Sequence, residues 1–268
     1  MRTARKASMS RTIGLTAAGV VLLSGLVGCA GGHGKYTKER SSAAKLKLDA
    51  MKSATDYDMA RQSFLAGDLN KALTRVDSSI RTNGEVAKSH VLRGRILNEL
   101  GATDQSISAF HMALAIEEEN VEAHYYLGVI YERLTDRESA LRKFVEASEI
   151  EPNEAQYAVA AAEMMIDLDR IDEAEAFLTD REDTFRHNPG VRQTLGHIAM
   201  MRGDSQTAAE MFAEARLLAP EDTSVLEDLA HAYVAVADFG RAESAITKLL
   251  RGEPDRRDLQ HVRARCLV

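Results

Sequence analysis

The sequence has little of several residue types that characterise particular protein classes. Among its 268 residues are only two Cys, four Pro and no Trp, and aromatic residues make up 5%. Two cysteines cannot build a disulfide framework, and so little proline excludes a collagen-like or low-complexity chain. The net charge of −7 lacks the basic excess of nucleic-acid-binding proteins, so no nucleic-acid partner is expected. With 45% hydrophobic residues, the chain can nevertheless bury a core.

The amino terminus has the pattern of an export signal. Residues 1–11 carry four basic side chains and no acidic one, and residues 13–27 are mostly apolar. A run of fifteen residues is short for a membrane-spanning helix, so the pattern predicts a signal peptide. The run ends in Leu26-Val27-Gly28-Cys29, which resembles the lipobox of bacterial lipoproteins.

That resemblance implies that residues 1–28 are removed and that Cys29 becomes the lipid-modified first residue. The alternative is an ordinary signal peptide, or an uncleaved anchor, with an incidental cysteine. Removal of residues 1–28 would lower the net charge from −7 to −11, which suits a domain held at a membrane by lipid. Ala30 after the cysteine implies the outer membrane, on its periplasmic side, in a Gram-negative organism. Residues 29–40 are predicted to be a flexible tether.

A repeat of 34 residues runs from residue 53 to 256 without a gap. One position is always Gly or Ala: Ala60, Gly94, Gly128, Ala162, Gly196 and Ala230. Twelve residues later a second small residue recurs: Ala72, Ser106, Ala140, Ala174, Ala208 and Ala242. Four residues further on the side chain is bulky and apolar: Val76, Phe110, Phe144, Leu178, Phe212 and Ile246. Small residues let two helix backbones approach while the bulky one fills the space beside them, so the pattern predicts antiparallel helix pairs.

Other features of the repeat also favour helix pairs. Nothing in the chain alternates with a period of two over a useful length, so no strand is predicted. Gly67, Gly101 and Gly203 fall in the turn between the two helices of three units. An Asp stands at the start of every second helix, where a carboxylate can cap free backbone N–H groups: Asp68, Asp104, Asp136, Asp172, Asp204 and Asp238.

The segment 124–131, followed by Ala140, Phe144, Ala147 and Pro152, resembles a tetratricopeptide repeat (TPR). The resemblance implies an all-α fold over residues 41–268, a right-handed α-solenoid of six TPR helix pairs with a C-terminal capping helix. The predicted units are 53–86, 87–120, 121–154, 155–188, 189–222 and 223–256, and the predicted cap is 257–268. The unit 155–188 departs most from the pattern, with Asp169 in its turn and Arg181 where Ala is usual, so a looser unit is expected there.

No motif in the chain predicts catalysis. It contains no phosphate-binding glycine loop, no His-Glu-x-x-His helix and no Gly-x-Ser-x-Gly turn. His197 and His231 occupy the same place in neighbouring units, but no third metal ligand accompanies them. Cys266 is expected to be a partly buried residue of the capping helix, with a bridge to another chain as the alternative. We therefore expect no enzyme, no cofactor and no metal site.

The first helices of the units are predicted to line a concave groove. Tyr57, Arg61, Arg95, Tyr125 and Tyr126 are the candidate peptide-binding residues, because aromatic and Arg side chains are frequent anchors. They suit an extended or helical segment with acidic and apolar residues. In the alternative, Asp58 and Glu99 pair with the two arginines along the same helices, and the two adjacent tyrosines pack between units.

The sequence thus predicts a lipid-anchored scaffold that gathers other cell-envelope proteins. The repeats and the lipobox are similar to those of pilotins, which assist type IV pilus secretin assembly, and of lipoproteins of tight-adherence secretion systems. This similarity implies pilus or secretion-system assembly as an alternative function. A regulator that recruits a cell-wall enzyme is a further alternative.

Overall fold

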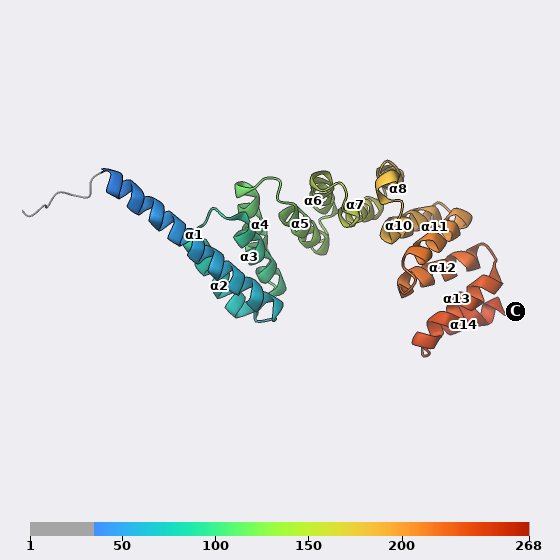
Figure 1. Cartoon of the computed structure of the whole chain (residues 1–268). Coiled ribbons are helices and arrows are strands. Elements are labelled where there is room, and N and C mark those ends of the chain that lie inside the picture. Colours follow the sequence, from blue (N-terminus) through green and yellow to red (C-terminus); the bar gives the residue numbers. More distant parts are fainter. Residues whose placement is uncertain (1–34, 268) are drawn as a thin grey trace, which may run out of the picture. The chain divides into compact units, whose positions relative to one another are not determined.

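The computed structural model describes residues 35–267, which contain fourteen helices and no strand (Figure 1). The chain divides into two units, Met1–Leu46 and Lys47–Val268, and the helix pairs and surfaces below belong to the second. The helices are α1 Lys35–Leu65, α2 Leu69–Thr82, α3 Ala87–Glu99, α4 Thr103–Ile116, α5 Val121–Arg133, α6 Arg137–Ile150, α7 Ala155–Asp167, α8 Ile171–Thr179, α9 Glu182–Phe185, α10 Pro189–Met201, α11 Ser205–Leu218, α12 Thr223–Ala235, α13 Phe239–Gly252 and α14 Arg257–Cys266.

Twelve of the helices form six pairs, as the repeat predicts, while the short α9 follows the fourth pair and α14 follows the sixth. We call the first helix of each pair the A-helix and the second the B-helix; the pairs are α1–α2, α3–α4, α5–α6, α7–α8, α10–α11 and α12–α13. Each A-helix after the first also contacts a helix of the preceding pair, so neighbouring units stack. The all-α fold prediction is confirmed.

Glycine and phenylalanine are matched across three of the pairs. A Cβ added to any of the three repeat glycines of the A-helices would lie 2.5–2.7 Å from a ring atom of the B-helix, in the pairs Gly94–Phe110, Gly128–Phe144 and Gly196–Phe212. In the other three units Ala takes the glycine position, and the bulky residue is the smaller Val76, Leu178 or Ile246. All six small positions are buried. The repeat therefore conserves the combined volume of the two side chains that meet between the helices.

The turn between the two helices of each unit contains one residue with a left-handed backbone. Gly67, Gly101 and Gly203 have φ between 74° and 77°, and Thr135, Asp169 and Ala237 take the equivalent place with φ between 59° and 61°. Only glycine adopts this conformation without steric cost. All six turns thus require one residue with positive φ, and the three glycines predicted from the sequence meet this requirement in three of them.

Ala237→Gly is expected to stabilise the chain by about 1 kcal/mol, because it removes the Cβ strain at positive φ and loses no contact of consequence at this exposed turn. Urea unfolding monitored by circular dichroism measures this change. Gly203→Ala is the reciprocal control, and it should destabilise the chain by a similar amount. A neutral Ala237→Gly variant would show that the turn carries no strain.

The capping prediction is confirmed for four of the six aspartates and is wrong for two. Asp68, Asp136, Asp204 and Asp238 stand at the N-caps of α2, α6, α11 and α13 and accept a hydrogen bond from a backbone N–H three residues on. In α4 and α8 the N-cap residues are Ala102 and Arg170, without a side-chain cap. Asp104 and Asp172 lie instead in the first helical turn, where they interact with the helix dipole but do not cap.

The second helix of the fourth unit is shorter than those of its neighbours, and Arg181 supplies a physical reason. α8 has 9 residues, whereas α6 and α11 have 14, and the short α9 follows it. The residues equivalent to Arg181 in α6 and α11 are Ala147 and Ala215, both fully buried. A guanidinium cannot occupy that tight site. Arg181 turns back instead, placing its guanidinium carbon 3.8 Å from the Phe177 ring centroid.

The amino-terminal end of the described chain differs from the sequence prediction. α1 begins at Lys35, so residues 35–40 are helical and do not belong to a flexible tether. The predicted signal peptide, Cys29 and the rest of the predicted tether lie outside the described residues. In α14, Leu259 is buried and Cys266 is a free, partly buried thiol, but Leu267 is 66% exposed and does not share their packing. Within the described residues, no helix carries an apolar stretch of the length needed to cross a bilayer.

Candidate partner-binding site

A cavity of about 350 Å³ between the first two A-helices brings together three of the five predicted groove residues. Tyr57 and Arg61 of α1 and Arg95 of α3 line it. Arg61 and Arg95 are 34 residues apart, so stacking of equivalent helices brings both side chains to the same cavity. The repeat register therefore positions this part of the site.

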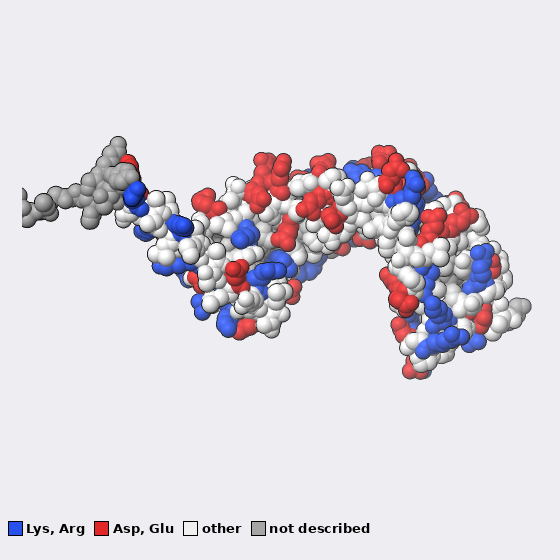
Figure 2. Space-filling model, in the orientation of Figure 1, with Lys and Arg blue, Asp and Glu red and all other residues white. Residues whose placement is uncertain are grey.

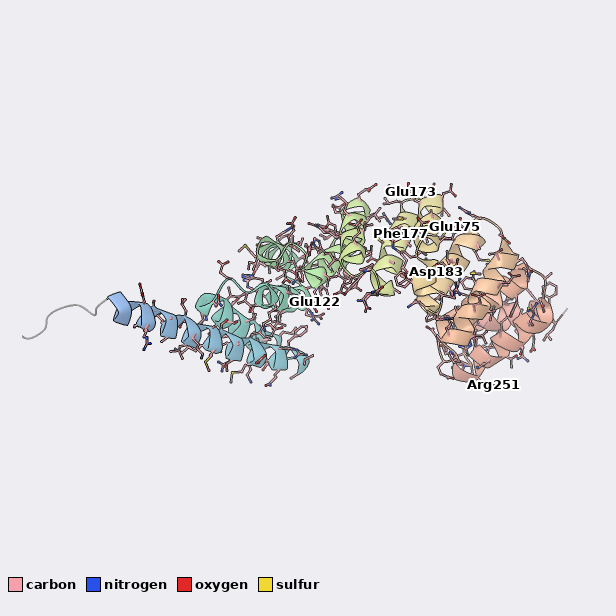
Figure 3. The ribbon with its side chains drawn as sticks, turned by 45° about the horizontal axis from the view of Figure 1, so that its top comes forward. Glu122, Glu173, Glu175, Phe177, Asp183 and Arg251 are labelled. Atoms are coloured by element: carbon pink, nitrogen blue, oxygen red, sulfur yellow. The ribbon has the colours of Figure 1, made fainter. Side chains whose placement is uncertain are left out.

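The cavity also contains residues outside the five candidates. Its other lining residues are Phe64, Leu65, Lys88, Val91, Leu92 and Glu122. Glu122 stands at the start of α5, in the third unit (Figure 3). Lys88 and Glu122 belong to different units from Arg61, and such neighbours cannot be identified from spacing within one helix.

Cations outnumber anions around the cavity. The Lys88 ammonium lies 4.5 Å from the Tyr57 ring centroid. The Arg95 guanidinium carbon lies 5.2 Å from the Phe64 ring and 5.0 Å from the Tyr126 ring. All three distances are within the range of cation–π attraction. Three cationic side chains and one carboxylate thus line a cavity with aromatic walls.

The arginines are not neutralised in the way that the alternative prediction required. The ion pair of Arg95 is with Glu122, at 3.9 Å, and not with Glu99. Within residues 35–267, Arg61 makes no ion pair, either with Asp58 or with another residue. The Arg95–Glu122 contact is longer than a hydrogen bond. The site therefore retains an unsatisfied preference for negative charge.

The phenol of Tyr57 is held in its neutral form. Burial raises the pKa of Tyr57, and the Glu122 carboxylate raises it further, whereas Arg61 and Arg95 act in the opposite direction. At neutral pH the hydroxyl is therefore protonated and available as a hydrogen-bond donor. A partner carboxylate or carbonyl oxygen can accept that bond.

The two adjacent tyrosines do not line this cavity and take part in packing instead. Tyr125 lies 5.7 Å from Phe144 and 5.3 Å from Tyr157, measured between ring centroids. Tyr126 stacks on Phe110 at 5.8 Å and connects with the cavity only through Arg95. Both tyrosines are partly buried, so their described contacts correspond to the inter-unit packing alternative.

A second polar cluster links the fifth and sixth units. His197 Nε2 and Gln193 Nε2 lie 2.9 Å and 2.6 Å from Asp228 Oδ2. Burial alone would raise the pKa of Asp228, but the hydrogen bonds from His197 and Gln193 outweigh it and lower the pKa. His231 is exposed, on the same A-helix face. Among the described residues, no group of three or more His, Cys, Asp or Glu side chains is placed to hold a metal ion.

The hydrogen bond to Asp228 raises the pKa of His197 above its ordinary value of 6.5, although burial lowers it. Charged His197 therefore stabilises the folded chain fully when the pH is below the imidazole pKa of the unfolded chain. This stabilisation is lost as the pH rises through the higher His197 pKa of the folded chain. The stabilisation from charged Asp228 is lost only as the pH falls through that residue's lowered pKa. Asp228→Asn should lower the His197 pKa in a proton NMR titration, and an unchanged titration would contradict this assignment.

Comparisons with known proteins agree with the fold. Residues 199–266 match a tetratricopeptide-repeat family model. A solved structure of PilF from Pseudomonas aeruginosa is similar with a TM-score of 0.68 and 13% identity, covering 81% of this chain and 99% of that one. PilW, a widely conserved type IV pilus biogenesis factor, is similar with a TM-score of 0.67 and 17% identity, covering 78% of this chain and 97% of that one.

A curated relative is much longer than this chain. The CTR9 homologue of Arabidopsis thaliana is 27% identical over 174 residues, which are 61% of this chain and 16% of that protein. At such identities the structural likeness concerns the fold alone. Helix pairs in an unbroken 34-residue register, the match of residues 199–266 and the solved structures lead to one conclusion: the chain is an all-α solenoid of helix pairs like those of tetratricopeptide-repeat proteins.

Proposed function

We propose that this protein is a non-catalytic adaptor of the bacterial cell envelope, anchored to a membrane through lipid on Cys29. In this proposal its A-helix face binds a segment of another envelope protein. The observation that carries the proposal is the cavity between α1 and α3, where Arg61, Lys88 and Arg95 are accompanied by the single carboxylate of Glu122. A surface with unpaired cations and aromatic walls is typical of a protein-binding site.

The lining of the cavity indicates the chemistry of the segment. An acidic side chain can replace Glu122 beside Arg95 and reach the unpaired Arg61. An apolar neighbour can pack on Leu65, which is 72% exposed. Displacement of a weak internal ion pair by a closer external one favours binding, since charge-assisted hydrogen bonds are the stronger kind. The proposed groove comprises Tyr57, Arg61 and Arg95. Tyr126 adjoins it through the contact of its ring with Arg95, and Tyr125 packs behind Tyr126.

A stacked scaffold needs no cofactor to perform this role, and we expect no nucleic-acid partner. On the face shown in Figure 2, acidic side chains gather over α6 and α8. Such a surface would repel a phosphate backbone, whereas the cationic cavity is confined to the first units. The partner is therefore expected to be a protein.

Assembly of a type IV pilus or of a related secretion system is a second candidate function. Its support is the similarity of fold to PilW, which is a type IV pilus biogenesis factor, combined with the lipobox-like residues 26–29. This candidate specifies the partner but leaves the proposed binding surface unchanged.

Photo-crosslinking in native cells tests the proposed function. Leu65, an exposed lining residue, is replaced by benzoylphenylalanine, and Met112 on the B-helix α4, which is 50% exposed, serves as the control position. A discrete envelope protein crosslinked through residue 65 and not through residue 112 is the expected result. A pilus or secretin component would favour the second candidate, and a wall hydrolase would favour the regulator. Equal crosslinking at both positions would refute a site in this cavity.

The anchor is tested separately by cell fractionation. Cys29→Ala should abolish labelling by radioactive palmitate and move the protein out of the membrane fraction, while the folded repeats retain their helicity. Continued membrane association of an unlabelled variant would contradict anchoring through Cys29.

A further inference from the structure

The first unit has a face that no other unit exposes. Thr55, Met59 and Gln62 of α1 are exposed. The residues equivalent to Thr55 in the next five A-helices are buried: Ser89, Ala123, Tyr157, Val191 and Val225. The residues equivalent to Gln62 are buried as well: Ile96, Ile130, Met164, Ile198 and Ala232. In those units a helix of the preceding pair packs against the A-helix. Among the described residues, α1 has no such neighbour in front of it.

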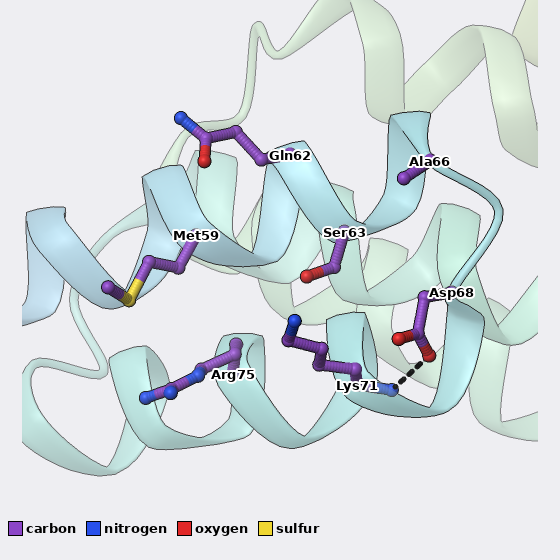
Figure 4. Close-up of a pocket in the computed structure, with 7 residues that line it drawn as sticks. All are labelled: Met59, Gln62, Ser63, Ala66, Asp68, Lys71 and Arg75. Atoms are coloured by element: carbon purple, nitrogen blue, oxygen red, sulfur yellow. Dashed lines mark hydrogen bonds between the residues drawn. The ribbon is translucent and has the colours of Figure 1, made fainter.

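This face is hollowed along its length. One cavity of about 340 Å³ is lined by residues of α1 and α2 that include Met59, Lys71 and Arg75 (Figure 4). A second cavity of about 530 Å³ is lined by residues that include Met51, Lys52, Met59 and Arg75. Because the two cavities share Met59 and Arg75, they form one groove between α1 and α2, which we call the end groove.

The floor of the end groove is apolar and flexible. Met51 is 62% exposed and Met59 44%, and the two lie about two helical turns apart on α1. Thr55 stands between them, one turn from each. Unbranched methionine side chains adapt to helices of varied sequence. A stripe of this spacing suits the apolar face of a helix lying along α1.

The rim of the end groove is cationic. Within residues 35–267, the ammonium groups of Lys52 and Lys71 make no ion pair. The carboxylates nearby are already engaged. Asp68 caps α2, and the Asp56 carboxylate accepts hydrogen bonds from Arg75 and Ser78. An incoming helix would therefore be favoured if it carried carboxylates beside the rim.

We propose that the end groove binds an amphipathic α-helix of a partner protein, with apolar residues on α1 and Asp or Glu beside Lys52, Lys71 and Arg75. The partner helix takes the place that a B-helix of a preceding unit would occupy. A second copy of this chain is a poorer occupant, because its α14 carries the exposed cations Arg257 and Arg265. This site is distinct from the cavity between α1 and α3 and does not depend on the proposed function.

Methyl NMR on the full chain labelled at methionine tests this proposal. The probe is a synthetic helical peptide of about 18 residues, five turns, with Leu on one face and Glu on both flanks. A control peptide of otherwise identical sequence, called the twin, carries Lys in place of every Glu. The Met51 and Met59 methyl signals, assigned with Met51→Leu and Met59→Leu, are expected to shift with the acidic peptide and not with the twin.

Charge reversal then locates the site. Lys71→Glu combined with Arg75→Glu should weaken binding of the acidic peptide at least tenfold, whereas Arg81→Glu on the same helix should change it less than twofold. If the double variant does not fold, the wild-type affinity must still fall steeply with ionic strength. No shift at Met51 and Met59, equal binding of the twin, or affinity independent of salt would each overturn the proposal. Peptide-free dimers that bury Met51 and Met59 would overturn it in favour of a second copy.

Discussion

Gly128→Ala is expected to destabilise the chain by about 2 kcal/mol, because the new Cβ would lie 2.5 Å from a ring atom of the buried Phe144. Helix propensity acts in the opposite direction, favouring alanine by about 0.5–1 kcal/mol. The free-energy cost of the clash is larger than this gain, because the Phe144 ring is buried between two helices and cannot move away from the new Cβ. Urea unfolding measured with the full chain gives the net value.

Two further variants separate the clash from a general effect of the substitution. Gly240 lies near the start of α13, where an added Cβ would meet no atom closer than Asp238 Oδ1 at 4.0 Å, so Gly240→Ala should be neutral or slightly stabilising. Combining Gly128→Ala with Phe144→Leu recreates the alanine–leucine pair of the fourth unit, Ala162–Leu178. The double variant should lose about 1–2 kcal/mol less than the sum of the single changes. Strict additivity would mean that these two positions do not meet.

Arg61→Glu combined with Arg95→Glu is expected to weaken capture of the envelope partner about 100-fold, with helicity and melting unchanged. Arg61 is exposed without an ion pair among the described residues. The ion pair of Arg95 is the long contact to Glu122, and its guanidinium also lies near the Phe64 and Tyr126 rings. Reversal of their charge therefore removes little from the folded chain. It converts a cationic cavity into one that repels an acidic segment. Binding of the crosslinked partner to the purified variant measures the effect.

A charge-matched control uses two arginines outside the cavity. Arg81 lies on α2, and Arg251 lies on α13 (Figure 3). Arg81→Glu combined with Arg251→Glu changes the net charge by the same amount and should leave capture intact. If both double variants lose capture alike, net charge governs binding and the cavity does not. If neither does, the partner binds elsewhere.

Most of the fold could be predicted because the repeat encodes contacts that are local in the chain. Gly128 and Phe144 are separated by one turn between two helices, and stepping by 34 residues transfers their contact to every unit. The same register placed Arg61 and Arg95 at one cavity. It did not identify the N-caps of α4 and α8, because Asp104 and Asp172 stand two residues beyond the capping position held by Ala102 and Arg170.

The remaining site residues depend on contacts between units, which no spacing within a helix reveals. Lys88 approaches the Tyr57 ring from the next unit, and Glu122 reaches Arg95 from the one after. The partner that the sequence suggested for Arg95 was Glu99, one turn away on the same helix. The helical start of α1 at Lys35 was also missed, since a polar segment rich in Lys and Ser resembles a tether by composition.

Amide hydrogen exchange of the chain, alone and with its captured partner, tests the central claim most directly. If the partner binds the A-helix face of the first units, protection should rise in residues 57–65 of α1 and 88–95 of α3, while α4 and α6 exchange as before. Protection confined to the B-helices, or spread evenly along the chain, would contradict a binding site formed by equivalent A-helices.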